Sequence, residues 1–294
     1  MSSRLTIRRE VELSGTGLFT AKPARVRLCP ARDHGISLRR IDANLPEAMR
    51  AALPARVSNV QAMPGLPGRN TVLGPAPSAP LFITTEHVLS SLAGLGVTDC
   101  LIELDGQELP MFDGSASAFV EAIQSAGLEE IVGRADPLRI TEAVRVEGPG
   151  GASIVAQPRS TPGCSFSYTL DYAGTAGGEH IPRQTATWDG SAASYAAGVA
   201  PARTFCLAHE AVALRQAGLF LHVTPREMLV LDAAGRPVEN TLRFSDEPAR
   251  HKLLDLIGDL ALVGRPIQAD ITATRAGHAL NQEMARRLVA ASVG

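Results

Sequence analysis

The alternation of apolar and polar residues along the first half of the chain predicts short strands and two helices. Apolar residues that recur every three or four positions indicate the helices, and period-two runs indicate the strands. The helices are expected at Thr85–Leu95 and Ala116–Ser125, the second started by the cap Asp113-Gly114-Ser115. The strands are expected at Arg25–Cys29, Ile36–Arg40 and Cys100–Leu104, with a polar, Pro/Gly-rich passage around 64–80.

The second half repeats this mixture after an expected linker from Gly127 to Pro137. Its helices are predicted at Ala208–Gln216, at Pro248–Val263 and from about Ala279. Its strands are predicted at Leu138–Glu147, Ser153–Ala156, Phe166–Tyr172, Met228–Leu231 and Ile267–Thr274. We therefore expect an α+β protein with an N-terminal domain over 1–128 and a C-terminal domain over 138–294.

An internal similarity supports two related halves. The segment His87–Gly94 and the segment His251–Gly258 both begin with His, have Leu two and five residues later, and end on Gly. Coincidence between two amphipathic helices is the alternative, since Leu at helical spacing is common. If the similarity is real, each domain presents a His from the same helical position.

Composition and charge exclude several classes of function. The 294 residues are enough for two domains, and a net charge of −2 without a basic stripe argues against nucleic-acid binding. No apolar run is long enough for a spanning helix, and the N-terminus lacks the apolar core of a signal peptide. The four scattered cysteines fit neither a disulfide framework nor a thiolate zinc site, which favours a reducing cytoplasm.

One helical face carries the candidate chemistry. His251, Asp255 and Asp259 are spaced by four residues and share that face. His and a carboxylate one turn apart are good Zn²⁺ ligands, but a catalytic zinc usually has three protein ligands. The similar segment supplies His87, next to Glu86, whose carboxylate is free to act as a base.

Simpler interpretations of the same residues stay open at this point. A His followed by Asp one turn later is commonly a surface hydrogen-bonded pair. His278, where a strand passes to a helix, is also placed for a helix cap. Gly15-Thr16-Gly17 is a hairpin turn rather than a phosphate loop, because the rest of such a motif is missing.

Six stretches together resemble the signature segments of the UDP-3-O-acyl-N-acetylglucosamine deacetylases. They occur in the order of that family and extend over nearly the whole chain. The stretches are Thr84-Thr85-Glu86-His87, Gly94-Leu95-Gly96-Val97-Thr98-Asp99, Pro110-Met111-Phe112-Asp113-Gly114-Ser115-Ala116, Ala202-Arg203-Thr204-Phe205, the segment Arg250–Asp259, and Gly277-His278-Ala279-Leu280-Asn281.

The resemblance implies two domains, each a small β-sheet with two helices, with the helices sandwiched between the sheets. It implies one Zn²⁺ per chain, held by His87, His251 and Asp255, with Fe²⁺ as an alternative in the cell. The implied reaction removes the N-acetyl group from UDP-3-O-(3-hydroxyacyl)-N-acetylglucosamine, the committed step of lipid A biosynthesis. The implied protein is a cytoplasmic monomer that touches the inner membrane only transiently.

The resemblance also assigns catalytic roles. Glu86 would be the general base for the attacking water, and protonated His278 would stabilise the oxyanion and protonate the leaving amine. Asp259 would orient His278, and Thr204 would donate a hydrogen bond to the oxyanion.

Substrate contacts are implied as well. Phe205 would pack on the substrate and Lys252 would meet its polar head. Only two of the 28 basic residues are lysines, and Lys252 directly follows a candidate ligand, so a compact ammonium rather than a planar guanidinium fits there.

Two segments depart from the family pattern. Gly15-Thr16-Gly17-Leu18 is followed by Phe19, where the family commonly has His. The insert at about 204–232, which by resemblance lines an acyl-chain tunnel, carries the bulky Phe220, Val223 and Met228. These side chains either narrow the tunnel, point outward, or are accommodated by a shifted backbone.

Two other functions compete with the deacetylase. One is a catalytically silent relative that serves as a binding or regulatory module, which the complete set of His87, His251, Asp255, Glu86 and His278 disfavours. The other is a zinc amidohydrolase for a different N-acyl sugar, which the altered insert leaves open.

Overall fold

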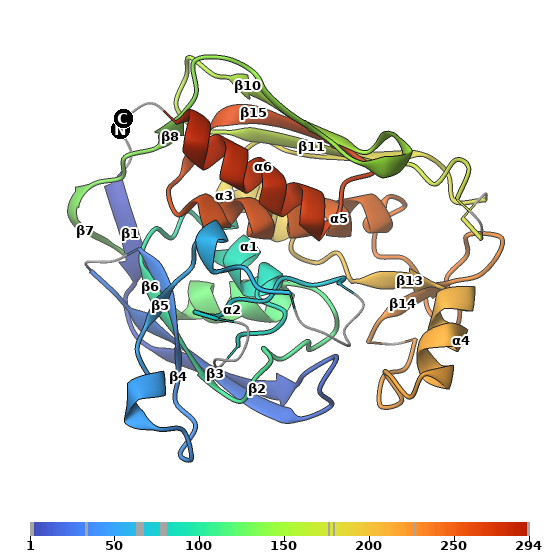
Figure 1. Ribbon diagram of the computed structural model, residues 1–294, viewed down its shortest axis with the longest axis horizontal. Helices are drawn as coiled ribbons and strands as arrows, with labels where there is room; N and C mark the ends of the chain where they lie inside the picture. The colour runs from blue at the N-terminus through green and yellow to red at the C-terminus, as the bar shows by residue number, and fades with distance from the viewer. Residues whose placement is uncertain are drawn as a thin grey trace.

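The computed structural model describes residues 3–32, 35–62, 68–76, 81–175, 177–178, 180–225 and 227–292. Parts of the predicted polar passage around 64–80 lie outside these residues. In the described residues, two large β-sheets enclose a layer of helices, and two further sheets have two strands each (Figure 1). The predicted α+β class and the layer of helices between sheets are confirmed.

The first half builds a five-stranded sheet in the order β2-β3-β6-β4-β5. Every second residue in the middle of β3 is buried, which gives the sheet one apolar face for the helices. The strands are β2 (Val11–Thr16), β3 (Pro23–Pro30), β4 (Ile36–Arg40), β5 (Leu53–Pro54) and β6 (Cys100–Asp105). The helices are α1 (Glu86–Gly94) and α2 (Ser117–Ala126), with short 3₁₀ turns at Glu47–Met49 and Val57–Asn59.

The predicted linker is wrong over most of its length. It contains the strand β7 (Leu128–Arg134), which pairs antiparallel with β1 (Ser3–Ile7). Only Ile131 of β7 is buried, and Val132 is almost fully exposed, so the strand has little of the apolar alternation that reveals strands in a sequence.

The second half builds a six-stranded sheet in the order β12-β11-β15-β10-β9, with β8 paired to β15. The predicted strand Leu138–Glu147 is divided here into two. The strands are β8 (Leu138–Arg139), β9 (Val144–Glu147), β10 (Ser153–Pro158), β11 (Ser165–Leu170), β12 (Gln184–Trp188) and β15 (Ile267–Thr274). The helices are α3 (Ala192–Gly198), α5 (Glu247–Leu260) and α6 (His278–Ala291), with 3₁₀ turns at Pro149–Gly151 and Ala261–Val263.

The insert forms a small lobe of its own at the side of this sandwich (Figure 1). It consists of β13 (Phe205–Leu207), the helix α4 (Ala208–Gln216) and β14 (Leu229–Leu231). The two strands are parallel, and no residue of α4 is buried.

Helices α1 and α5 cross in the middle of the molecule, and the glycines that close the two similar segments permit close packing. A Cβ at Gly258 would lie 2.1 Å from the main-chain oxygen of Glu86, so only glycine fits at this crossing. A Cβ at Gly94 would lie 2.3 Å from the ring of Tyr195. Both halves thereby join one continuous apolar core.

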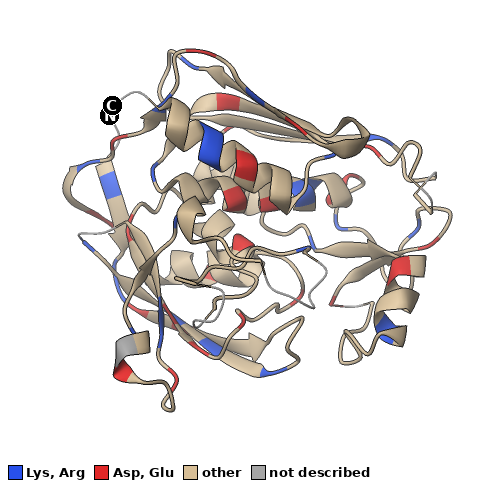
Figure 2. Ribbon diagram, in the orientation of Figure 1, with Lys and Arg blue, Asp and Glu red and all other residues tan. Residues whose placement is uncertain are grey.

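Acidic residues on the surface are mixed with basic ones, whereas three acidic residues of the central helices are buried. Figure 2 shows acidic and basic positions interspersed around both sheets, with further acidic positions on the central helices. The carboxylates of Glu86, Asp255 and Asp259 on these helices are all buried. Among the described residues, no helix is both long and apolar enough to cross a bilayer.

Candidate active site

Three predicted metal ligands converge where α1 crosses α5. His87 comes from the first turn of α1, and His251 and Asp255 lie one turn apart on α5. One nitrogen or oxygen atom from each residue lies within 4.8 Å of the others, and all three residues are buried. The structure therefore brings together the three residues that the sequence spacing and the similar segment suggested as metal ligands.

The geometry of this set fits one divalent cation. The Asp255 Oδ1 lies 3.5 Å from His251 Nε2 and 3.9 Å from His87 Nε2. Ligands bonded at about 2 Å to a tetrahedral ion are about 3.3 Å apart, so a small inward movement suffices. His251 Nδ1 donates to the main-chain oxygen of Ala202 at 3.1 Å, which leaves Nε2 free for a metal.

Electrostatics keep the three ligands in their metal-binding protonation states. Burial, reinforced by neighbouring His251, lowers the pKa of His87 to about 3. Burial also lowers the pKa of His251. Burial alone would raise the pKa of Asp255, but the charge of Lys252 and the imidazoles hold it far below its usual range. A cation therefore displaces no protons from these residues at neutral pH.

Lys252 contacts the metal-ligand set directly. Its Nζ donates to Asp255 Oδ2 at 2.7 Å, whereas Oδ1 faces the two histidines. Burial opposes the charge of Lys252, but Asp255 raises its pKa above the usual value. The carboxylate of Asp255 thus lies between the ligand imidazoles on one side and an ammonium on the other.

Glu86 precedes His87 at the start of α1 and is only 3% exposed. Its Oε2 accepts a hydrogen bond from the main-chain N–H of Thr71 at 3.0 Å. Burial raises the pKa of Glu86 to about 8, although the neighbouring His278 charge works against this rise. A cation bound beside it would lower that pKa, because positive charge favours the carboxylate.

His278 lies at the first residue of α6 and is held by Asp259. Its Nδ1 is 2.8 Å from Asp259 Oδ2, and its Nε2 points toward the ligand set, 3.8 Å from Asp255 Oδ2. Burial disfavours the charged ring, but Asp259 and Asp255 overcome it and raise the pKa of His278 to about 9. The ring is therefore an imidazolium at neutral pH.

Thr71 was not predicted, and it joins the two sides of the site. Its main chain donates to Glu86, and its Oγ1 donates to Asp259 Oδ1. Asn281 Nδ2 donates to the other oxygen of Asp259 at 2.8 Å. Thr71 lies within the irregular polar passage around 64–80, where no periodicity marks a functional residue, so only the folded structure reveals its position.

Thr204 and Phe205 are the first residues of the insert. The ring of Phe205 meets the ring of His251 edge-on, with centroids 6.5 Å apart. The main-chain N–H of Thr204 donates to the oxygen of Gly114 at 2.8 Å, which ties the insert to the turn before α2. Among the described residues, the Thr204 hydroxyl has no hydrogen-bond partner in the protein.

The three bulky residues of the insert are buried. Phe220, Val223 and Met228 are 7–8% exposed and pack together with Leu18, Met111 and Cys206. The alternative in which they point outward is therefore wrong. The ring of Phe19 meets the ring of Phe220 edge-on at 5.2 Å, so the two departures from the family pattern are in direct contact.

Comparison with known proteins identifies the family of this chain. A sequence model of the family described as LpxC, UDP-3-O-acyl N-acetylglycosamine deacetylase, matches residues 4–290. The chain belongs to this family. Its members are metalloenzymes, in agreement with the buried His87, His251 and Asp255 set.

Individual relatives are similar over nearly their whole length. A protein of Anaeromyxobacter sp. (strain Fw109-5) is 34% identical over 97% of this chain and 88% of its own. Proteins of Coxiella burnetii (strain CbuK_Q154) and Cellvibrio japonicus (strain Ueda107) are each 34% identical, over 99% and 98% of this chain and 91% of their own. All three are named UDP-3-O-acyl-N-acetylglucosamine deacetylase.

We predict that the His251→Ala protein loses its stoichiometric divalent metal, because two remaining ligands from different helices hold an ion weakly. Elemental analysis after gel filtration measures the metal content. His222→Ala is the matched control, since this histidine contacts the main chain of Gly17 far along the sequence from the ligands. Full metal content in the His251→Ala protein would contradict the assignment of His251 as a metal ligand.

Proposed function

We propose that the chain hydrolyses the N-acetyl group of UDP-3-O-acyl-N-acetylglucosamine, a step of lipid A biosynthesis. One observation carries this proposal. A buried carboxylate, Glu86, and an imidazolium, His278, both lie beside the candidate metal ligands. These ligands are His87, His251 and Asp255. Membership of the family gives the substrate class.

An acetamide needs an activated nucleophile, a stabilised oxyanion and a proton for its leaving amine. A divalent cation at the ligand set supplies Lewis-acid polarisation and a more acidic water. Glu86 takes the proton from the attacking water. Its Oε2 is held by the N–H of Thr71, so the other oxygen is free to face the substrate.

His278 supplies the acid. Its Nδ1–H is committed to Asp259, so the proton on Nε2, which points toward the ligand set, is the one available to substrate. This N–H stabilises the oxyanion and then passes its proton to the leaving amine. The free hydroxyl of Thr204 is the second donor, and one such donor contributes about 3 kcal/mol to transition-state stabilisation in other enzymes.

We further propose Zn²⁺ as the resident ion and a monomer as the active form. Two imidazoles and a carboxylate suit zinc, and Fe²⁺ is the second candidate because it accepts the same ligands. His87, His251 and Asp255 all come from one chain, which supports the proposal of a monomer. All four cysteines are free thiols, which agrees with a reducing cytoplasm.

The insert is proposed to receive the acyl chain and to set its preferred length. Phe19 and Phe220 touch, and Val223 and Met228 fill the space beside them. Each methylene of the acyl chain that these side chains exclude from the tunnel weakens the binding free energy by about 0.8 kcal/mol, close to fourfold in affinity. A tunnel shortened by two to four carbons would change kcat/KM by roughly ten- to a few-hundred-fold.

Glu86→Gln should keep its metal and lose about 10²–10⁴-fold in kcat, because base and ligand are different residues. Acetate release from UDP-3-O-acyl-N-acetylglucosamine, with elemental analysis of the same sample, measures both. Glu283→Gln on the exposed face of α6 is the control. A wild-type protein that binds metal but releases no acetate would favour the silent relative, and a Glu86→Gln protein with more than a tenth of wild-type kcat would require another base.

Asp259→Asn should move the basic limb of the kcat/KM profile to lower pH. The acid form of His278 is lost as the pH rises through its pKa of about 9. Asp259 raises that pKa, so removing its charge lowers the pH at which activity declines. The shift should be at least about one pH unit, since a hydrogen-bonded carboxylate commonly moves a pKa by 1–3. An unchanged basic limb would show that His278 is not the acid.

Val223→Gly/Met228→Ala should shift the preference toward longer acyl chains, because it reopens the space that these residues fill. The measurement is kcat/KM for substrates with 3-hydroxyacyl chains of increasing length. Val212→Ala, at an exposed position on α4, is the matched control. If wild type and double mutant rank the chains identically, with the longest favoured, the backbone has preserved the family's tunnel and the insert has another purpose.

A further inference from the structure

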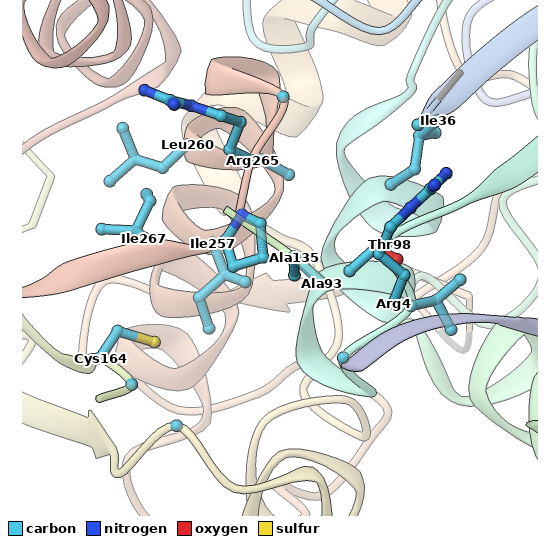
Figure 3. A pocket seen from close by; sticks show the side chains of 18 of the residues that line it. Arg4, Ile36, Ala93, Thr98, Ala135, Cys164, Ile257, Leu260, Arg265 and Ile267 are labelled. Atoms are coloured by element: carbon cyan, nitrogen blue, oxygen red, sulfur yellow. The ribbon is translucent and has the colours of Figure 1, made fainter. Parts of the chain in front are cut away.

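A cavity lies between the two halves of the molecule (Figure 3). Its volume is about 400 Å³, within the range of small-molecule sites. Figure 3 shows Ile257, Ile267 and Cys164 from the second half on one side and Ile36 and Thr98 from the first half on the other. The segment that connects the halves contributes Ala135.

The cavity is separate from the metal-ligand set. It uses Ala93 near the end of α1 and Leu260 at the end of α5, whereas the ligands His87 and His251 come from the earlier turns of those helices. Ile257 of the cavity is only two residues from the ligand Asp255, but at 3.6 residues per turn the two side chains lie on nearly opposite faces of α5. Six residues separate His87 from Ala93 and nine separate His251 from Leu260. At 1.5 Å per residue these spans are about 9 and 14 Å along the helices.

The interior of the cavity is apolar. Ile36, Val97, Ile257, Leu260 and Ile267 contribute aliphatic side chains to its wall. The aromatic rings of Phe166 and Trp188, which pack against each other, line it as well. An aliphatic chain would be removed from water by such a wall, which favours binding by the hydrophobic effect.

The cavity also carries an excess of positive charge. Two of its four arginines are neutralised, Arg4 by Asp99 and Arg265 by Asp136. The other two, Arg56 and Arg134, have no carboxylate partner anywhere in the described part of the chain. Two guanidinium groups therefore remain available to an anionic ligand.

Arg56 is held in position without being neutralised. Its Nη1 donates to the main-chain oxygen of Ala55 at 3.0 Å. A Cβ at Gly264 would lie 2.2 Å from the Arg56 Cζ, so the guanidinium packs against this glycine. Its side chain is half-buried, and burial lowers its pKa with no carboxylate to oppose the effect. A half-buried cation without a counter-ion gains when an anion pairs with it.

We propose that this cavity is a second ligand site, which binds a single-chain amphiphile with an aliphatic tail and a carboxylate head. The tail occupies the apolar wall, and the carboxylate accepts hydrogen bonds from Arg56 and Arg134. Fatty-acid anions have this chemistry. The site is distinct from the insert, and its occupancy is measurable without any assay of catalysis.

Trp188 makes the test specific, because it is the only tryptophan of the chain and lines the cavity. Bromine quenches tryptophan fluorescence only at close approach, so binding of a chain at the insert leaves the signal unchanged. The probes are ω-bromoundecanoate and the uncharged ω-bromoundecanol, each titrated below its aggregation threshold into the metal-loaded protein. We expect saturable quenching by both, with the acid bound at least about tenfold more tightly, as expected for charge-assisted hydrogen bonds.

Variants of the cavity distinguish the contribution of the ligand's carboxylate head to binding from that of its aliphatic tail. Arg56→Gln/Arg134→Gln should weaken the acid to the affinity of the alcohol, whereas Arg145→Gln, an exposed arginine on β9 paired with Glu147, should change neither. Ala261→Phe should abolish quenching by both probes by filling the cavity, and Ala93→Leu serves if that protein does not fold. The proposal is overturned if the acid does not quench saturably, if acid and alcohol bind equally, or if the double arginine variant binds the acid as wild type does.

Discussion

The close crossing of α1 and α5 is the constraint on which the rest of the structure depends. At Gly258 the main chain of α5 lies so near the carbonyl of Glu86 that a single methyl group would overlap it. This contact brings the first turn of α1 against the second half of α5. His87 and Glu86 from one half therefore meet His251 and Asp255 from the other, and neither half holds the complete set.

Burial of so many ionisable groups at one crossing is costly unless each is compensated. Asp255 is compensated by Lys252 and the surrounding imidazoles, and Asp259 by His278 together with Asn281 and Thr71. Glu86 is the exception, because one N–H from Thr71 does not offset its burial and its pKa is raised. Asp255 is thus held as a carboxylate, whereas the poorly compensated Glu86 is able to exchange a proton.

The sequence predicts the parts of this arrangement that follow from helical spacing. His251, Asp255 and Asp259 share a face because they are four residues apart, and the similar segment around His87 identifies the other helix. Thr71 was beyond such reasoning, since its role comes from lying near Glu86 and Asp259 in space and no local pattern records that. Strand β7 was missed because it buries one residue, and the contact of Phe19 with Phe220 joins residues that are far apart in sequence.

Anomalous diffraction at the absorption edge of the bound metal tests the central claim most directly, because it locates the ion without reference to activity. The account predicts one strong peak per chain, about 2 Å from His87 Nε2, His251 Nε2 and Asp255 Oδ1. A peak at any other set of side chains, or no peak in crystals of catalytically active protein, would contradict the metal centre at the crossing of α1 and α5.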